Sequence, residues 1–309
     1  MTNSLKYVLV TPARNEAQFI ELTIRSMIAQ THLPLKWVIV SDGSTDGTDE
    51  IVGRYLPDHP WIALVRMPER KERHFAGKVH AFDTGFDRVK DLDFDVIGNL
   101  DADVSFEADH FGYLLKRMAE NERLGLAGAP FREGNFQYDY RYSNIENVWG
   151  GCQLFRRKCF EEIGGYVPLK GGGIDHVAVL SARMRGWQTR TFIERVCQHH
   201  RVMGTAQHGG LKARVRQGQK DFAMGNHPLW QIFRVIYQMR QRPYIIGGLA
   251  LGWGYAWSLL RRSEIPMEKA LVKFAQKEQL LRLRLFFLGG RKRLGPKVTA
   301  VSASRSIHR

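Results

Sequence analysis

The sequence FDVIGNLDADV, residues 94–104, is the segment of this chain that most clearly indicates its fold. Its first seven residues form a largely apolar run that predicts a buried β-strand, and Asp101 and Asp103 follow where this strand would leave its sheet. Upstream, short strand-like runs alternate with stretches whose apolar residues recur at helical spacing. The strand-like runs are 6–11, 37–40 and 61–66, and the helix-like stretches are 17–30, 48–55 and 77–89. This alternation predicts βαβ units, and therefore an α/β fold with a mostly parallel sheet.

The composition is that of an ordinary globular protein, but the charge is unevenly distributed. With 309 residues, 44% hydrophobic and 25% charged, the chain can bury a large core, and disorder, collagen-like repeats and a disulfide scaffold are excluded. Residues 1–205 contain 26 Lys and Arg against 27 Asp and Glu, whereas residues 206–309 contain 20 against 4. We therefore expect a balanced α/β domain over 1–205, a helical basic region over 206–288 and a disordered basic tail over 289–309.

Two features bear on the compartment in which the protein works. The three cysteines, Cys152, Cys159 and Cys197, form an odd set without Cys-x-x-Cys spacing, so we expect small buried side chains in a reducing compartment and no zinc site. The N-terminal segment, MTNSLKYVLVTPARNE, has no basic start, no long apolar region and no small-residue cleavage site. It therefore shows no export signal, and we expect a cytoplasmic protein.

Three segments of the basic region have helical character. Residues 227–239 are mostly apolar, the 17 residues 244–260 carry no charge and are bracketed by arginines, and residues 266–288 place apolar residues at helical spacing among Lys and Arg. The charge alone would allow nucleic-acid binding, but an uncharged apolar stretch has no place in a solvated nucleic-acid arm. A buried pair of helices is the structural alternative. We favour peripheral or monotopic attachment to an anionic membrane surface, and we place a true span third because spanning takes about 20 residues.

The two aspartates after the fourth predicted strand could serve different groups of one ligand. One carboxylate can accept hydrogen bonds from a ribose, while the other holds a divalent cation that bridges two phosphates, because Mg²⁺ and Mn²⁺ prefer oxygen ligands and take few of them from protein. Asp-x-Asp alone also occurs by chance in surface loops. Its position matters here, because ligands of open α/β sheets bind outside the carboxyl ends of the strands. We therefore interpret Asp101 and Asp103 as ligand-binding residues.

Two further polar clusters follow predicted strands. In VSDGSTDGT, residues 40–48, Asp42 comes directly after a strand, where its carboxylate could accept hydrogen bonds from a base or a sugar. The surrounding residues are also those that turns and helix caps prefer, so both roles can hold. In TPARNE, residues 11–16, the structural alternative is a plain loop with Glu16 near a helix N-terminus. Both clusters lie at the same predicted edge of the sheet as the aspartate pair.

These three clusters, together with four other segments, resemble the family 2 glycosyltransferases. The segments that carry the resemblance are TPARNE, SMIAQT, VSDGSTDGT, GKVHAFDTG, NLDADV, GGCQLFRRKCFEEIGGY and GIDHVAVLSARMRGW. They cover about residues 6–201, and their order and spacing argue against chance similarity. The resemblance implies a GT-A-like fold, which is a Rossmann-like, mostly parallel sheet flanked by helices. It also implies transfer of a sugar from a nucleotide-diphosphate sugar with inversion at the anomeric carbon.

The resemblance assigns roles to individual residues of this sequence. On the donor side, Pro12, Arg14 and Glu16 would line the nucleotide pocket, Asp42 would contact the base, Lys78 would lie near the nucleotide, and Asp101 would contact the ribose or the sugar. Asp103 would bind a Mg²⁺ or Mn²⁺ ion on the pyrophosphate, and Asp175 would be the catalytic base. The structural alternative for Asp175 is a helix N-cap.

The sequence departs from the family pattern at three places. Ile174 stands where the family has the Glu of its Glu-Asp pair, so only Asp175 of that pair is carried over. Asp83 stands where the family usually has Asn. The Gln-x-x-Arg-Trp motif of the processive synthases is absent, since residues 198–201 read Gln-His-His-Arg. This absence points to the addition of a single sugar.

His199 and His200 follow a short strand that we predict over residues 191–197. Either imidazole could be a further metal ligand, although carboxylate suits Mn²⁺ better, and a surface or hydrogen-bonded histidine is an equally good interpretation. Because side chains alternate along a strand, only one of the two can face the site. We favour His200.

Sequence alone thus predicts a metal-dependent glycosyltransferase that moves one sugar from a nucleotide-diphosphate sugar, a UDP-sugar by preference, to a lipid-linked or saccharide acceptor. We expect it to act in cell-surface or exopolysaccharide assembly, on the cytoplasmic face of the membrane, and to have no nucleic-acid partner. Two alternatives remain open. A nucleotidyltransferase on a similar sheet would release pyrophosphate rather than a nucleoside diphosphate. A non-catalytic membrane scaffold would not depend on Asp175.

Overall fold

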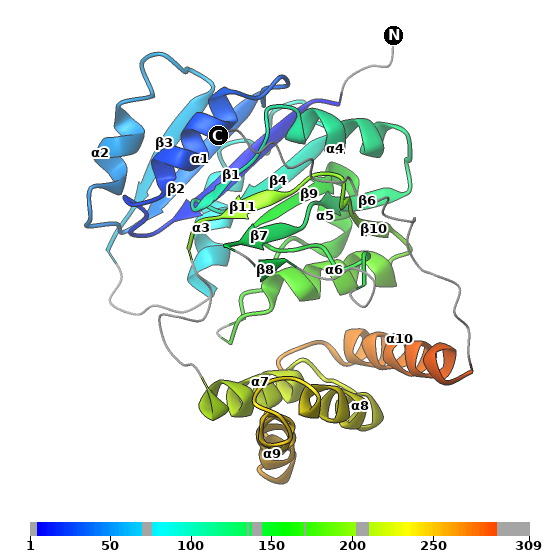
Figure 1. Ribbon diagram of the computed structural model, residues 1–309. Coiled ribbons are helices and arrows are strands. Elements are labelled where there is room, and N and C mark those ends of the chain that lie inside the picture. Colours follow the sequence, from blue (N-terminus) through cyan, green and yellow to red (C-terminus); the bar gives the residue numbers. More distant parts are fainter. Residues whose placement is uncertain are drawn as a thin grey trace, which may run out of the picture.

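The computed structural model describes residues 5–69, 76–134, 136–137, 144–169, 171–201 and 210–288 (Figure 1). The strands within these residues are β1 (Tyr7–Ala13), β2 (Lys36–Asp42), β3 (Ile62–Met67), β4 (Val96–Leu100), β5 (Val104–Ser105), β6 (Leu124–Gly128), β7 (Phe131–Glu133), β8 (Phe136–Gln137), β9 (Cys152–Arg156), β10 (Gln188–Thr191) and β11 (Cys197–His199). The helices are α1 (Ile20–Ile28), α2 (Thr48–Gly53), α3 (Ala76–Phe86), α4 (His110–Ala119), α5 (Arg157–Ile163), α6 (Ile174–Met184), α7 (Leu211–Ala223), α8 (Pro228–Met239), α9 (Ile246–Leu260) and α10 (Lys269–Phe287).

The main sheet has seven strands in the order β10-β6-β9-β4-β1-β2-β3. Its neighbouring strands are parallel except beside β9, which runs antiparallel to both β4 and β6. The predicted α/β fold with a mostly parallel sheet is therefore confirmed. The four strands predicted upstream of Asp101 are all present, with small shifts at their ends.

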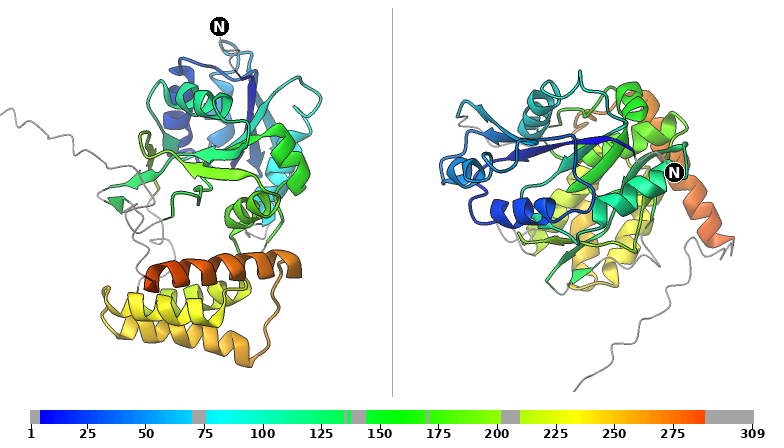
Figure 2. Two further views of the ribbon diagram at one scale, coloured as in Figure 1. Left: turned by 90° about the vertical axis from the view of Figure 1, so that its right-hand side faces the viewer. Right: turned by 90° about the horizontal axis from the view of Figure 1, so that it is seen from above.

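Helices cover both faces of this sheet and make it the middle layer of three (Figure 2). The side chains of β1 alternate between the two faces. Val8 and Val10 join a core that includes residues of α3 and α6, whereas Tyr7 and Leu9 join a core that includes residues of α1 and α4. Burial on both faces explains why the central strands read as continuous apolar runs rather than as alternating ones.

A second sheet of four short strands, in the order β5-β11-β7-β8, lies beside the carboxyl end of β4. Its formation contradicts the single strand predicted over residues 191–197. The main-sheet strand β10 already ends at Thr191, and β11 of the small sheet begins only at Cys197. Between them the chain turns, with the amide of Arg195 bonded to the carbonyl of Phe192. The apolar run is therefore divided between two sheets, which its composition does not reveal.

Helices α7 to α10 form a separate layer beneath the α/β part, with α9 outermost (Figures 1 and 2). Helices α7 and α9 touch backbone to backbone. A Cβ atom added at Gly254 would overlap the carbonyl of Val215, and one added at Gly218 would overlap the carbonyl of Leu251. The glycines of the uncharged segment 244–260 thus allow close helix packing. None of the helices in the described residues is long and apolar enough to cross a membrane.

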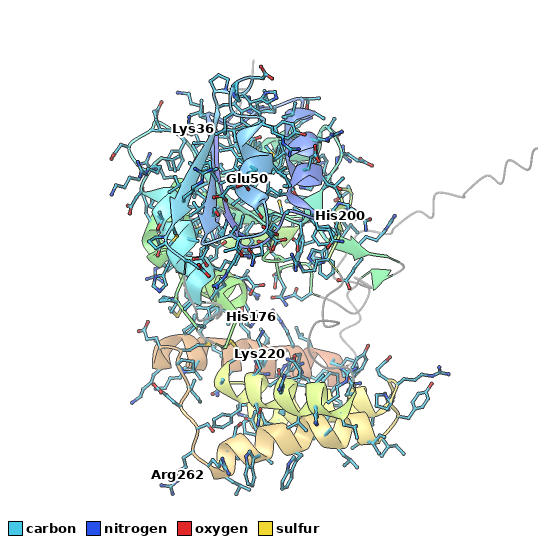
Figure 3. The ribbon with its side chains drawn as sticks, turned by 90° about the vertical axis from the view of Figure 1, so that its left-hand side faces the viewer. Lys36, Glu50, His176, His200, Lys220 and Arg262 are labelled. Atoms are coloured by element: carbon cyan, nitrogen blue, oxygen red, sulfur yellow. The ribbon has the colours of Figure 1, made fainter. Side chains whose placement is uncertain are left out.

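Helix α10 connects this layer to the α/β part. Met267, just before the helix, and Leu271 are buried in the same core as residues of α6. Arg183 of α6 donates from Nη2 to Oε1 of Glu278 at 2.5 Å. In Figure 3, His176 of α6 and Lys220 of α7 mark the two sides of the same junction. The buried-helix alternative therefore holds for the first part of α10. The predicted boundary between residues 205 and 206, and the predicted tail 289–309, lie outside the described residues.

Candidate active site

The polar clusters that follow the first, second and fourth predicted strands meet at one edge of the sheet. Pro12, near the end of β1, is paired with Val40 of the parallel strand β2, which ends at Asp42. The guanidinium of Arg14 lies 3.9 Å from the Asp42 carboxylate (Nη1 to Oδ2). Asp101 follows directly on β4, which is paired with β1. The carboxyl ends of neighbouring parallel strands therefore bring these residues together, as the sequence pattern predicts.

Lys78, in the first turn of α3, forms an ion pair with Asp101, donating from Nζ to Oδ1. Burial raises the pKa of the Asp101 carboxyl, and the ammonium of Lys78 opposes this effect. Burial alone would lower the pKa of Lys78, but the carboxylates of Asp101, Asp175 and Asp103 outweigh it and raise that pKa. Lys78 therefore stays charged within a set of three acidic groups.

The Asp103 carboxylate is held between two basic side chains. Its Oδ2 lies 3.5 Å from Nε2 of His199 and 3.2 Å from Nε of Arg201. Burial would raise the pKa of Asp103, but these two neighbours outweigh burial and lower it. Arg201 also pairs with Glu16, so one guanidinium bridges two acidic residues that are far apart in the sequence. The Asp103 carboxylate is thus ionised, and the side chains of His199 and Arg201 contact one of its oxygens.

The structure places the imidazole of His199, and not that of His200, beside the Asp103 carboxylate, which corrects our preference between the two. The Nε2 atom of His200 lies 2.8 Å from Oγ of Ser105, and its ring stacks on Phe19 at a centroid distance of 6.4 Å. The alternation of side chains along β11 does separate the two imidazoles, but with the opposite assignment. We expected a strand that ends at Cys197, but the strand begins at that residue and contains His199. The phase of the alternation therefore could not be taken from the expected strand.

His199 has a second acidic partner, Glu133, which the sequence did not point to. Nδ1 of His199 lies 3.3 Å from Oε2 of Glu133, at the end of β7. Burial would lower the pKa of His199, but the contacts with Asp103 and Glu133 raise it. Glu133 lies in a three-residue strand without any motif, so only the pairing of β7 with β11 could have identified it.

Asp175 lies in the first turn of α6 and is partly exposed. The N-cap of this helix is Gly173, whose φ of 91° is left-handed, so the capping alternative for Asp175 is wrong. Its side chain lies against the backbone of Gly150, since a Cβ atom added there would be 2.7 Å from Cβ and 2.9 Å from Oδ2 of Asp175. The same loop binds the acidic edge: the carbonyl of Gly150 accepts from Nδ2 of Asn99, and that of Gly151 accepts from the amide of Asp101.

The donor atoms at Asp103 fit a divalent cation. Oδ2 of Asp103 and Nε2 of His199 face each other at 3.5 Å, so both can reach one ion. A single carboxylate with few other protein donors is the usual protein share of a Mg²⁺ or Mn²⁺ site in which phosphates supply further oxygens. Arg201 and Lys78 add positive charge on either side. The edge can therefore bind an anionic, phosphate-bearing ligand, and the Asp175 carboxylate lies near enough to act electrostatically on Lys78.

Comparison with known sequences supports this chemistry. The family model described as Glycosyl transferase family 2 matches residues 8–163, just over half of the chain. Poly-beta-1,6-N-acetyl-D-glucosamine synthase of Staphylococcus aureus (strain COL) is 27% identical over 117 residues, which is 38% of this chain and 26% of the synthase. Chondroitin synthase of Pasteurella multocida (strain Pm70) is 27% identical over 124 residues, 40% of this chain and 12% of that protein. The chain thus matches only a minor part of these relatives' lengths.

Solved structures resemble the chain over most of its length. The mannosyltransferase PcManGT from Pyrobaculum calidifontis, in complex with GDP-Man and Mn²⁺, has a TM-score of 0.58 and 20% identity, and the match covers 94% of this chain and 89% of that one. S. aureus TarS 1-349 in complex with UDP-GlcNAc has a TM-score of 0.53 and 10% identity, with 91% and 81% covered. At these identities the likeness establishes the fold, which is the GT-A fold.

Proposed function

Because the chain belongs to glycosyl transferase family 2, we propose that it moves a single sugar from a nucleotide-diphosphate sugar to an acceptor hydroxyl, with inversion at the anomeric carbon. One observation carries this proposal: Asp175 lies beside the edge that holds Asp101, Asp103 and Lys78. An inverting transfer needs a base on the acceptor side and positive charge where the diphosphate leaves. The edge supplies both within one site.

Asp175 is the proposed base. Its carboxylate takes the proton of the acceptor hydroxyl while the hydroxyl oxygen forms a bond to the anomeric carbon. The bond between that carbon and the diphosphate oxygen breaks, and its electron pair leaves with the nucleoside diphosphate. Asp175 is partly exposed at the start of α6, so an acceptor can reach it. Gly150 has no side chain and therefore leaves room for the side chain of Asp175. Ile174 offers no second carboxylate, so Asp175 acts alone on this side.

The remaining residues bind the donor. Arg14 and Asp42 lie together, and the resemblance assigns Asp42 to the nucleobase of the donor and Pro12, Arg14 and Glu16 to the lining of the nucleotide pocket. Asp101 accepts from the ribose or the sugar. Asp103 and His199 would hold Mg²⁺ or Mn²⁺, and the bound ion supplies positive charge to the leaving diphosphate. Lys78 and Arg201 add charge of the same sign and stabilise the departing phosphates.

A UDP-sugar is the donor we favour. The relatives whose names state a product make a polymer of N-acetyl-D-glucosamine and chondroitin, and one structural neighbour was solved with UDP-GlcNAc. The other neighbour was solved with GDP-Man, so the first experiment includes both nucleotides. These names also favour a saccharide or lipid-linked acceptor in the assembly of a surface polysaccharide. The reading Gln-His-His-Arg at 198–201 favours addition of one sugar.

The helical layer supports a membrane-bound acceptor. Helices α8, α9 and the end of α10 leave large apolar side chains in solvent, including Trp253 at 57%, Leu260 at 74% and Phe287 at 73% exposure. The exposed apolar residues of these helices are Leu229, Ile232, Ile236, Tyr237, Ile246, Leu249, Trp253, Leu259, Leu260, Leu280, Leu281, Leu285, Phe286 and Phe287. So many exposed large apolar side chains on neighbouring helices are typical of an interaction site. The excess of Lys and Arg in this part of the sequence favours an anionic leaflet, so we propose peripheral or monotopic attachment on the cytoplasmic face.

The first test is thermal stabilisation by UDP, GDP, dTDP and CDP, each with and without Mn²⁺. Ligands that bind the native state raise the melting temperature by mass action. We expect one nucleotide to do so only with the metal, and the shift to disappear in Asp103→Ala. Asp175→Asn serves as the matched variant, because it should keep the shift and lose about 10²- to 10⁴-fold in transfer rate.

The products distinguish the alternatives. Release of a nucleoside diphosphate supports sugar transfer, whereas release of pyrophosphate would identify a nucleotidyltransferase. If no nucleotide stabilises the protein even with anionic vesicles present, the donor site is absent and the scaffold interpretation holds. Unchanged transfer by Asp175→Asn would remove that residue as the base.

A further inference from the structure

Three soft donor atoms meet in the interior of the α/β part, and none of them belongs to a residue assigned above to the donor or the acceptor. His110 is the first residue of α4, Cys152 the first of β9 and Cys197 the first of β11. Nε2 of His110 lies 3.8 Å from Sγ of Cys152 and 3.7 Å from Sγ of Cys197, and the three donor atoms all lie within 4.8 Å of one another. All three residues have no exposed surface. Three elements far apart in the sequence thus converge on one point.

The distances match those of ligands around a single metal ion. Zinc lies about 2.3 Å from a cysteine sulfur and about 2.0–2.1 Å from a histidine nitrogen. With trigonal or tetrahedral angles at the ion, a sulfur and a nitrogen ligand are then about 3.5–3.8 Å apart. The two observed sulfur–nitrogen separations, 3.8 and 3.7 Å, fall at the upper end of this range.

The imidazole distinguishes this cluster from a simple pair of thiols. In the described structure its ring nitrogens have no polar partners other than the two sulfurs, and Nδ1 has no hydrogen-bond partner. The rings of Phe106 and Phe111 surround it at centroid distances of 5.1 and 5.3 Å. A disulfide would use the two sulfurs and leave a buried imidazole without a role. A metal ion uses all three donors.

We propose that His110, Cys152 and Cys197 bind one thiophilic d¹⁰ metal ion, Zn²⁺ or Cu⁺, as a site separate from the Asp103 edge. Two thiolates with one imidazole are the donors that such ions prefer over Mg²⁺ or Mn²⁺. Each thiol releases its proton to solvent as it becomes a ligand. Because the site is fully buried, the ion enters while the chain folds. The absence of Cys-x-x-Cys spacing, from which we expected no zinc site, does not apply to ligands collected from three separate elements.

The ion would hold the strands that shape the donor edge. Cys152 is paired with Leu100, the residue before Asp101, and the carbonyl of Gly151 accepts from the amide of Asp101. Cys197 begins the strand that ends at His199. The site is therefore structural, and its presence does not depend on the proposed transfer reaction.

The test measures metal in the full chain. The protein is produced in cells grown with added zinc or with added copper, purified without chelator, and examined by elemental analysis. We expect about one ion per chain in one of the two preparations, and at least about a tenfold loss in both Cys152→Ser and Cys197→Ser. Cys159→Ser is the matched control, since Cys159 is equally buried but packs near Gly125. Asp103→Asn should also keep the ion.

X-ray absorption at the metal edge of the unaltered protein gives an answer that does not require the variants to fold. Two sulfur neighbours with a nitrogen neighbour are expected. Titration of thiols after unfolding completes the set of outcomes. If all three thiols are free and neither preparation contains a thiophilic metal, His110, Cys152 and Cys197 are held together by hydrogen bonds alone. One free thiol would identify a disulfide, and metal that persists in both serine variants would place it elsewhere. Each of these results overturns the proposal.

Discussion

The side chain of Asp175 fits against the loop before β9 only because residue 150 has no side chain. A Cβ atom on Gly150 would lie 2.7 Å from Cβ of Asp175, closer than such atoms approach in proteins. The strand-side loop and the first turn of α6 therefore fix each other's positions. This contact sets where the carboxylate stands relative to Asp101, and it can be tested without altering any acidic residue.

Gly150→Ala should displace the Asp175 carboxylate and reduce transfer while leaving donor binding in place. A displacement of about 1 Å can cost about 100-fold in rate, so we expect kcat to fall by that order while the nucleotide-dependent shift in melting temperature stays. The measurement is release of nucleoside diphosphate under saturating donor. Gly53→Ala is the control, because nothing lies within 4 Å of a Cβ added there. A normal kcat in Gly150→Ala would show that this packing does not position the base.

Glu16 should make the protein less stable as the pH rises. Burial raises its pKa from 4.5 to about 7, assisted by Asp103 and opposed by Arg201. Between these two values the folded state holds a proton that the unfolded state has lost, so stability falls with rising pH and the loss is complete above about pH 7. Glu16→Gln has no such proton. Its stability relative to the unaltered protein should therefore increase between pH 5 and pH 8.

Urea unfolding in EDTA at several pH values measures this difference. Glu21→Gln is the control, because hydrogen bonds from Arg25 and Tyr55 lower the pKa of that exposed carboxyl and its effect is confined to lower pH. The relative stability of Glu21→Gln should stay level from pH 5 to pH 8. If the relative stability of Glu16→Gln also stays constant from pH 5 to pH 8, the effect of Arg201 on the pKa of Glu16 outweighs that of burial.

Gly254→Ala should separate α7 from α9. The added methyl group would overlap the carbonyl of Val215, so we expect a loss of about 1–3 kcal/mol in the free energy of unfolding. Gly252→Ala, two residues earlier on the same helix, meets only Val235 at 3.4 Å and should be neutral or stabilising. Chemical denaturation compares the two. Equal stabilities would mean that the two helices are not in close contact.

Loss of two arginines next to the exposed apolar surface should weaken membrane binding. Arg261 and Arg262 follow α9, and each contributes about 1 kcal/mol near an anionic surface, so replacing both with Gln should lower vesicle affinity about 30-fold. Sedimentation with anionic and neutral vesicles measures this. Arg54→Gln with Arg88→Gln removes two exposed charges from the α/β part and serves as the control. If both double variants lose vesicle affinity equally, the loss comes from the change in net charge and not from the position of the two arginines.

Local sequence patterns are sufficient to predict the parallel part of the fold. Apolar runs such as VLV in β1 and VIV in β2 are buried on both faces, and each ends in a polar loop at the same edge. The ion pair of Lys78 with Asp101 follows from this arrangement, because α3 begins at the edge where β4 ends. Residues at strand ends or helix starts near the edge therefore lie together in the structure, whereas their roles stay predictions.

Contacts made through the second sheet could not be predicted in this way. The strands β5, β7 and β11 have only two or three residues, which is too short for an alternating pattern to be recognised in the sequence. Glu133 was therefore missed, and His200 was preferred over His199 as the neighbour of Asp103. The same limit applies to the burial of Gly254 against α7. An uncharged glycine-rich segment has the same composition whether its glycines face lipid or a neighbouring backbone.

Helix α6 has a further consequence for the reaction we propose. Asp175 stands in its first turn, next to α7, since a Cβ atom on Gly173 would lie 2.9 Å from Sδ of Met224. Arg183, near its other end, is bonded to Glu278 of α10. Both ends of the helix thus contact the helical layer, which fixes the distance between the proposed base and the layer that would rest on lipid. Acceptors would then be sorted by reach: only a hydroxyl carried at one height above the headgroups meets the base, and longer or shorter stems are excluded by distance alone.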